Sequence, residues 1–359
     1  MNARPIAGSP RIISRDHRER GCSAARMPWG GCPRAARWAG ALGAVALAGC
    51  ALIDVQIADL EDVIIAEVQV LLTHEWNGDG ISFEAGALLH RTLQREETPT
   101  LRGSTVVISE PTKGSVRLEE RRDVEECVIP NSQSRDTIPG ELAPNAVCYR
   151  ANITVSPFDP GDRLSLKITT PDGRVLVGRS LVPGAFDLVE LDEEDGRCRL
   201  DPDTNYRFQW RFAENAWSYL ADARLEGLRL PMAQRGIDSP DTLYLLGFAI
   251  DAEDSTLVFS SEFGIFEFFA ATDEERDVIR ELRRGLPGGV RATLAMAAAD
   301  RNWVNWERGG NFNPSGEVRI PSVFRDGTGV FSTTTRRVVR IWGTELRPGT
   351  PPLCGPDVS

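Results

Sequence analysis

The sequence predicts a mainly β protein, in which an N-terminal β-sandwich is followed by a second β-rich domain carrying one short α-helix. Many short segments alternate apolar and polar residues with a period of two, which is the pattern of half-buried strands. Turn residues such as Pro, Gly, Asn and Asp separate these segments at short intervals, as in antiparallel sandwiches. The length that remains after an N-terminal leader is typical of two domains.

The first domain is expected over residues 63–184. Residues 63–72 place aliphatic side chains on one face and Glu67 and Gln69 on the other, as a half-buried strand does. Residues 163–169 and 174–180 show the same alternation around Thr170-Pro171-Asp172-Gly173. Proline suits the first central position of a tight turn and glycine is free to take positive φ, so these residues predict a hairpin.

The second domain is expected over residues 185–359, after the break at Pro183-Gly184. The alternation in 221–225 slips by one residue at Gly227, which indicates a bulge. The continuous apolar run 243–250 predicts a strand buried on both faces, and 290–299 are assigned to a strand as well.

One helix is expected near residues 273–284. Thr272 and Glu275 have the spacing of a capping box, acidic residues fill the first turn, and arginines precede Gly285. Val278, Ile279 and Leu282 provide a narrow apolar stripe that can pack on a sheet.

The N-terminus has the pattern of an export signal. Arg34 and Arg37 precede the apolar run 39–48, which is closed by Leu47-Ala48-Gly49-Cys50. The run is shorter than the roughly 20 apolar residues that span a bilayer. We therefore interpret residues 1–49 as a signal peptide, whose true start is Met27, and residues 50–62 as a tether.

The last four residues of this signal resemble the lipobox of bacterial lipoproteins. The resemblance implies that Cys50 is acylated and becomes the N-terminus of the protein. This N-terminus is then expected to be anchored in a membrane. Two or more acyl chains hold a protein stably, whereas one does so only marginally. Ala51 after the anchor implies the outer membrane by the same resemblance. The alternative is an ordinary signal peptide with a chance cysteine.

The charge of the chain argues against nucleic-acid partners. Eight of the 41 basic residues and two of the 52 acidic residues lie in positions 1–49, so residues 50–359 carry 33 against 50, a formal charge of −17. Nucleic acids and anionic lipid surfaces both require a basic face. The composition therefore predicts attachment by the acyl chains and not by surface charge.

Four cysteines remain after the anchor, an even number that suits disulfides in an oxidising compartment. Of the three possible pairings, we favour Cys127–Cys148 and Cys198–Cys354. The alternative is four reduced, buried thiols.

Few residues are suited to catalysis. Only His74 and His90 follow the leader, and no G-x-S-x-G, H-E-x-x-H or P-loop motif occurs. We expect both histidines to be structural and the protein to be non-enzymatic, with no cofactor and no metal. The acidic run 192–195 is interpreted as a solvated loop, with calcium binding as the alternative.

The segment 302–316 is the candidate binding loop, because its aromatic side chains are interleaved with amides and an arginine. Sugars and peptides are commonly bound by such groups. The alternative is a crossover loop whose tryptophans plug the sheet. The candidate residues are Trp303, Trp306, Arg308, Asn311, Phe312 and Asn313.

Three phrases of the sequence recur in this order in one kind of protein: Thr105-Val106-Val107-Ile108, the segment 164–173 and Asp326-Gly327-Thr328-Gly329-Val330-Phe331. They resemble uncharacterised two-domain bacterial envelope lipoproteins, a family known by a domain-of-unknown-function label. The resemblance covers most of residues 60–340 and implies a carboxypeptidase-regulatory-like N-terminal sandwich. Such proteins are often encoded near TonB-dependent outer-membrane receptors, and no catalytic residue carries over.

Together these observations predict a lipid-anchored envelope protein that acts as a non-catalytic binding or accessory module. Its expected partners are the membrane, an outer-membrane receptor, and a glycan or peptide ligand. Two alternatives stay open: a carboxylate-dependent hydrolase of envelope or imported glycans, and a structural or adhesion protein of the envelope.

Overall fold

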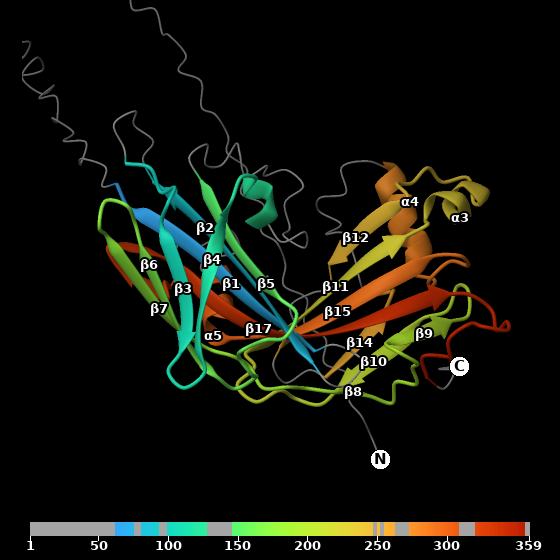
Figure 1. The fold of residues 1–359 in the computed structure, drawn as a ribbon. Coiled ribbons are helices and arrows are strands. Elements are labelled where there is room, and N and C mark those ends of the chain that lie inside the picture. Colours follow the sequence, from blue (N-terminus) through green and yellow to red (C-terminus); the bar gives the residue numbers. More distant parts are fainter. Residues whose placement is uncertain are drawn as a thin grey trace, which may run out of the picture. The chain divides into compact units, whose positions relative to one another are not determined.

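The computed structural model describes residues 62–74, 80–92, 99–127, 146–246, 250–251, 255–262, 273–308 and 320–355. Over these residues the fold is mainly β, as the sequence predicts, with one large mixed sheet and a second, small sheet (Figure 1). Residues 60–359 form one compact unit.

The first part of the chain is a β-sandwich around a single core. Alternate residues of its strands are buried, and the inward side chains of β1, β2 and β5 pack with those of β3, β6 and β7. Phe83 of the first group of strands is buried in this core together with Ile108 and Leu166 of the second group. The strands are β1 (Ile64–His74), β2 (Ile81–Arg91), β3 (Thr105–Glu110), β4 (Gly114–Arg121), β5 (Val147–Ile153), β6 (Arg163–Thr169) and β7 (Val175–Leu181), with the 3-10 helix η1 (Val124–Cys127) after β4.

The long strand β17 (Gly327–Gly343) belongs to both halves of the chain. It pairs in parallel with the whole of β1 and, further along, antiparallel with β15 (Arg291–Ala299). Phe331 of β17 and Val323 of the edge strand β16 (Val323–Arg325) lie in the core of the sandwich. Residues from beyond position 320 therefore complete the sheet that residues 63–184 begin.

Two glycines allow β17 to approach β1 closely. A Cβ atom on Gly327 would lie 2.5 Å from the carbonyl oxygen of Ile64, and one on Gly329 would lie 2.0 Å from that of Ala66. Gly329 also has a φ of +135°, which L-residues rarely adopt. The Gly-rich phrase before Val330 is thus explained by backbone packing between the two strands.

The second core is built from the remaining strands and two helices. Tyr219, Leu225 and Ile341 are buried there together with Val278 and Leu282. A small sheet has the order β14-β10-β8. The elements are β8 (Leu188–Val189), β9 (Arg197–Leu200), β10 (Tyr206–Trp210), β11 (Ser218–Glu226), α3 (Arg229–Gln234), β12 (Thr242–Leu246), β13 (Ile250–Asp251), β14 (Thr256–Phe259) and α4 (Asp273–Leu282).

The predicted helix and the strand at 290–299 are confirmed as α4 and β15. The apolar stripe of α4 is buried as expected, whereas Thr272 and the side chain of Glu275 lie outside the described residues. Two further helices, α3 and α5 (Arg301–Arg308), were not predicted.

Two local predictions were wrong. Gly227 does not mark a bulge: it has a φ of +82° at the end of β11, and the chain turns there into α3. The segment after Thr242 is not buried on both faces, because Leu243 and Leu245 are buried while Tyr244 between them is 48% exposed. One face of β12 packs on the second core through Leu243 and Leu245, and the opposite face, which carries Tyr244, is open to solvent.

Both favoured cysteine pairings are present as disulfides. Cys127 and Cys148 join η1 to β5, and Cys198 and Cys354 join β9 to the C-terminal segment. The second pair is fully buried in the second core.

Candidate functional site

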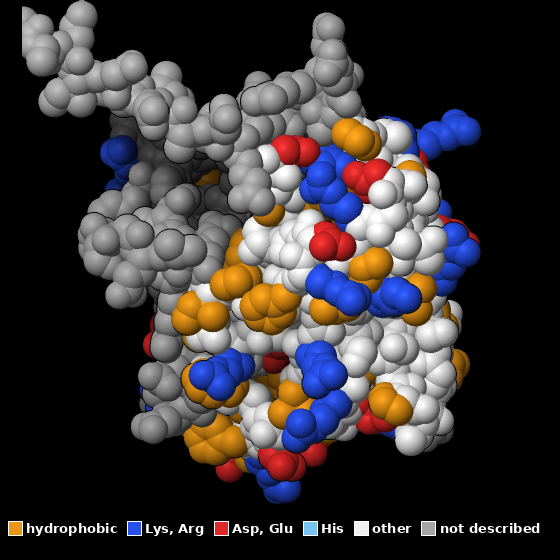
Figure 2. Space-filling model, turned by 90° about the vertical axis from the view of Figure 1, so that its left-hand side faces the viewer, with side chains coloured by type: hydrophobic (Ala, Val, Ile, Leu, Met, Phe, Trp, Pro, Cys, Tyr) orange, Lys and Arg blue, Asp and Glu red, His pale blue; other side chains and the backbone are white. Residues whose placement is uncertain are grey.

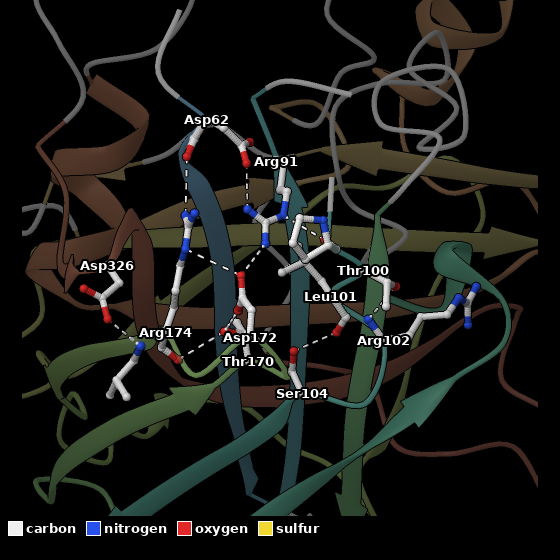
Figure 3. A network of polar contacts seen from close by, with 12 residues as sticks. Asp62, Arg91, Thr100, Leu101, Arg102, Ser104, Thr170, Asp172, Arg174 and Asp326 are labelled. Atoms are coloured by element: carbon white, nitrogen blue, oxygen red, sulfur yellow. Dashed lines mark hydrogen bonds and ion pairs between the residues drawn. The ribbon is translucent and has the colours of Figure 1, made fainter. Parts of the chain in front are cut away.

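A buried arginine of β2 holds the chain at Asp62, where the predicted tether ends and shortly before β1 begins. Arg91, whose side chain is 4% exposed, pairs with Asp62 at 2.7 Å and with Asp172 at 3.0 Å. Its Nε atom donates to the carbonyl oxygen of Pro99 at 3.1 Å. Figure 3 shows these groups converging from β2, from the β6–β7 turn and from the residues before β1. One planar guanidinium thus joins three segments that are far apart in sequence.

A second arginine reinforces this contact. Arg174 donates to the carbonyl oxygen of Asp62 at 3.4 Å and lies 3.6 Å from the carboxylate of Asp172 (Figure 3). Burial opposes ionisation of Asp172, but hydrogen bonds from Thr170 and Arg91 and the charges of both arginines outweigh it and lower the pKa of Asp172. We call Asp62, Arg91, Asp172 and Arg174 the tether clasp.

The predicted binding segment is in part a helix. Trp303 and Trp306 lie one turn apart on α5, which packs on β17, and both are half-buried. Arg308 is the last residue of α5, and its side chain lies outside the described residues, as do Asn311, Phe312 and Asn313. The structure therefore brings Trp303 and Trp306 together, and the remaining candidates stay predictions.

A buried polar network caps α5. Asp300 is 2% exposed, and its Oδ1 atom accepts a hydrogen bond from the backbone N–H of Trp303 at 2.9 Å, as an N-cap residue does. Its Oδ2 atom contacts the hydroxyl of Ser180 at 2.5 Å, and that hydroxyl lies 2.8 Å from the hydroxyl of Thr333. Burial raises the pKa of Asp300 to about 6. The network joins β7, β17 and α5.

Asn302 fixes the same helix to two strands. Its side-chain amide donates to the carbonyl oxygens of Arg179 at 2.7 Å and of Phe331 at 2.8 Å. Had the helix been predicted, the Asp immediately before it would have been recognised as its cap. Apart from nearby backbone N–H groups such as that of Trp303, the partners of the Asp300 and Asn302 side chains lie more than 20 residues away, so no local signal pointed to them.

Exposed aromatic side chains lie beside the start of α5. The Arg301 guanidinium is 5.0 Å from the centroid of the Trp217 ring, which is 43% exposed. Phe212, 56% exposed, lies near Tyr219, with ring centroids 6.5 Å apart. A ring face combined with a cation can contact a sugar or an aromatic ligand side chain. Neither Trp217 nor Arg301 was predicted to be a binding residue, because no sequence motif links the two positions.

The two histidines lie at the ends of neighbouring strands. His74 ends β1, and burial, followed by the charge of Arg337, lowers its pKa. Burial also lowers the pKa of His90. The hydroxyl of Ser180 is bound to Asp300 and Thr333, not to an imidazole.

The acidic loop is tied to its surroundings by ordinary contacts. Glu193 accepts a hydrogen bond from the backbone N–H of Gly196, and Asp195 pairs with Arg197 at 3.2 Å. Within the described part of the chain, no cluster of three or more His, Cys, Asp or Glu side chains has the arrangement of a metal site. Nor does any helix of that part have the length and apolarity needed to cross a bilayer.

Cys50 lies outside the described residues, and its lipidation stays a prediction. No protein-family model matches the chain, and no curated protein is significantly similar to it. The resemblance to two-domain envelope lipoproteins is therefore also still a prediction.

Proposed function

We propose that the chain is a lipid-anchored lipoprotein of the bacterial cell envelope, where it acts as a non-catalytic binding or accessory module. The observation that carries the proposal is the apolar run 39–48 closed by Leu47-Ala48-Gly49-Cys50. A thiol directly after the cleavage site is the group that becomes acylated. The acyl chains then insert into the membrane.

Two features of the folded part support this location. The four cysteines that follow Cys50 form two disulfides, which are typical of exported proteins. The tether clasp holds the chain at Asp62, twelve residues after Cys50. A membrane anchor at Cys50 is therefore joined to a rigid sheet by a short segment.

The accessory role is supported by the surface at the start of α5. Trp217 and Arg301 form an exposed aromatic–cation pair, and Trp303 and Trp306 follow on the same helix. We propose that this surface binds a glycan or a peptide segment of an outer-membrane receptor, of the TonB-dependent kind that the family resemblance implies.

The anchor is tested by expressing the full chain in a Gram-negative host that is fed an alkynyl fatty acid. We expect the protein to carry the label and to fractionate with the outer membrane. The Cys50→Ala variant should carry no label and should leave the membrane fraction. An unlabelled parent protein would overturn the proposal.

The accessory role is tested by cross-linking in intact cells, followed by purification of the lipoprotein. A receptor recovered in near-equal amount is expected, and Trp217→Ala or Trp303→Ala should reduce its recovery while the circular dichroism of the protein is unchanged. The exposed Tyr244→Ala variant is the matched control, because Tyr244 lies opposite Arg224, near the end of β11 that is remote from Trp217. Recovery of the parent protein alone would overturn the receptor role.

A further inference from the structure

The outer face of the sandwich carries an ordered row of cations and apolar side chains. The outward residues Val107 of β3, Lys167 of β6 and Val177 of β7 are direct cross-strand neighbours. Arg117 of β4 continues the row on one side and Phe324 of β16 on the other, where Phe324 is 54% exposed. Arg179 and Arg163 project from β7 and β6 on the same face. We call these seven residues the basic face.

Acidic residues are excluded from the centre of this face. In β3, β6, β7 and β16 the outward positions hold Thr, Val, Ser, Arg, Lys, Leu and Phe, but neither Asp nor Glu. Figure 2, which looks onto the side where β6 and β7 lie, shows Lys and Arg side chains interleaved with hydrophobic ones, and acidic side chains mainly towards the top and bottom of the view. The chain as a whole is strongly acidic, so the basic face is a segregation of charge that composition does not reveal.

The cations of the basic face differ from the other lysine of the chain. Lys113, in the β3–β4 turn, is held by Asp159 and Asp162, both at 2.7 Å. Among the described residues, Arg163, Lys167 and Arg179 have no carboxylate partner. Their charges are therefore available to an external anion.

The basic face ends at the tether clasp. Asp172 and Arg174 lie in the turn that joins β6 to β7, the two central strands of the face. Asp62 lies twelve residues after Cys50, and a chain of that length spans at most about 40 Å when extended. An anchor at Cys50 therefore keeps the bilayer surface within reach of this face.

We propose that the basic face docks on the anionic phospholipid headgroups of the membrane in which Cys50 is anchored. Arg117, Arg163, Lys167 and Arg179 contact lipid phosphates, and the exposed ring of Phe324 enters the headgroup region. The inference rests on the proposed lipidation of Cys50. It replaces the expectation, drawn from net charge, that the chain has no electrostatic contact with lipid.

The chain contains only two lysines, which makes amine footprinting a direct test. The purified, lipidated protein is reconstituted in vesicles of phosphatidylcholine alone or of phosphatidylcholine mixed with phosphatidylglycerol. It is then treated with an acetylating reagent and analysed by mass spectrometry. We expect acetylation of Lys167, relative to Lys113, to fall on the anionic vesicles alone. The protection should disappear in about 1 M salt, where the Debye length is about 3 Å.

A charge-loss variant separates electrostatic docking from simple proximity. Each cation near an anionic surface contributes about fivefold to binding, so Arg163→Ser with Arg179→Ser should weaken docking about 25-fold and restore acetylation of Lys167. The matched control, Arg207→Ser with Arg211→Ser, removes the same charge from exposed positions in and just after β10 and should keep the protection.

The outcomes distinguish the inference from its premise. If Cys50 carries acyl chains but Lys167 reacts equally on both kinds of vesicle, docking is overturned and the anchor stands. If Cys50 carries no acyl chain, the proposed function fails and the inference fails with it. Protection of Lys167 in intact cells but not on anionic vesicles would assign the face to another envelope component and would also overturn membrane docking.

Discussion

The carboxylate of Asp300 lies 2.5 Å from the hydroxyl oxygen of Ser180, although the two residues are 120 positions apart in the chain. Ser180 contacts Thr333, which donates to the carbonyl oxygen of Leu181 at 3.1 Å. The Ser180 hydroxyl donates to the Asp300 carboxylate, and this hydrogen bond favours the ionised form. Burial of Asp300 outweighs that effect and raises the pKa of its carboxyl group to about 6.

Asp300 should therefore make the stability depend on pH. Its folded pKa of about 6 lies above the ordinary carboxyl value of 3.8, so the folded state retains a proton that the unfolded chain loses. The resulting stabilisation is complete below pH 3.8 and is lost as pH rises through about 6. The loss is roughly 3 kcal/mol in the free energy of unfolding. Urea unfolding of the parent protein and of Asp300→Asn measures it, and the Asn variant should lack this slope.

Removal of the Asp300 side chain should be more damaging than its neutralisation. Asp300→Ala removes the cap of α5 and one of the two buried partners of the Ser180 hydroxyl, for an expected loss of about 2–4 kcal/mol. Asparagine retains the cap, so Asp300→Asn should be more stable than Asp300→Ala at pH 7. Equal stability of the two variants would contradict the assigned role.

Gly329→Ala should destabilise the fold through the contact between β17 and β1. A Cβ at this position meets the Ala66 carbonyl oxygen at 2.0 Å, so one strand must shift, at an expected cost of about 3 kcal/mol or more. Gly114→Ala is the control, because Gly114 also has positive φ but has open space around it. Thermal unfolding should show a much larger decrease in Tm for Gly329→Ala. Similar decreases would mean that φ strain, and not strand packing, is the cause.

The two disulfides should contribute unequally. The pair Cys198–Cys354 closes a separation of 156 residues and Cys127–Cys148 one of 21. Chain entropy predicts stabilisation of about 5 and about 3 kcal/mol, respectively. Guanidinium unfolding of the two paired Cys→Ala variants measures this difference. A larger loss from the shorter loop would contradict it.

Arg91→Met should destabilise the protein by about 3–5 kcal/mol, because it leaves the carboxylates of Asp62 and Asp172 without their buried partner. Arg91→Lys should not restore the stability, since one ammonium group cannot reproduce the planar contacts to both carboxylates and Pro99. The control Arg102→Met removes an exposed pair with Glu120 and should cost less than about 1 kcal/mol. Chemical unfolding at pH 7 compares the three variants.

Acid should weaken the same clasp. The folded pKa of Asp172 lies below the ordinary carboxyl value, so its contribution is present above that value and is lost as pH falls through the folded pKa. In the Arg91→Met variant, the loss of stability that is due to protonation of Asp172 at low pH should be smaller than in the parent protein. A pH titration of the unfolding midpoint in both proteins is the measurement, and parallel curves would contradict the role of Arg91.

Local pattern was sufficient for the parts of the structure that depend on neighbouring residues. The period-two alternation located β1, β6 and β7, because successive side chains of a strand point to opposite faces whatever its partner is. Acidic and basic ends located α4 through the dipole of the helix itself. The candidate residues Trp303 and Trp306 were selected from composition, but their helix was missed because Gly309 and Gly310 suggested a loop.

The tertiary structure alone decided which strands become neighbours. Short segments and residue counts of the sequence were enough to predict a β-rich, cysteine-bridged chain and to locate the apolar run 39–48, because these properties are local. The pairing of β17 with β1, the contact of Asp300 with Ser180 and the pairing of β3 with β6 in the basic face all join residues more than 50 positions apart. Such pairings depend on loop closure and on the packing of whole faces, which no window of local sequence contains.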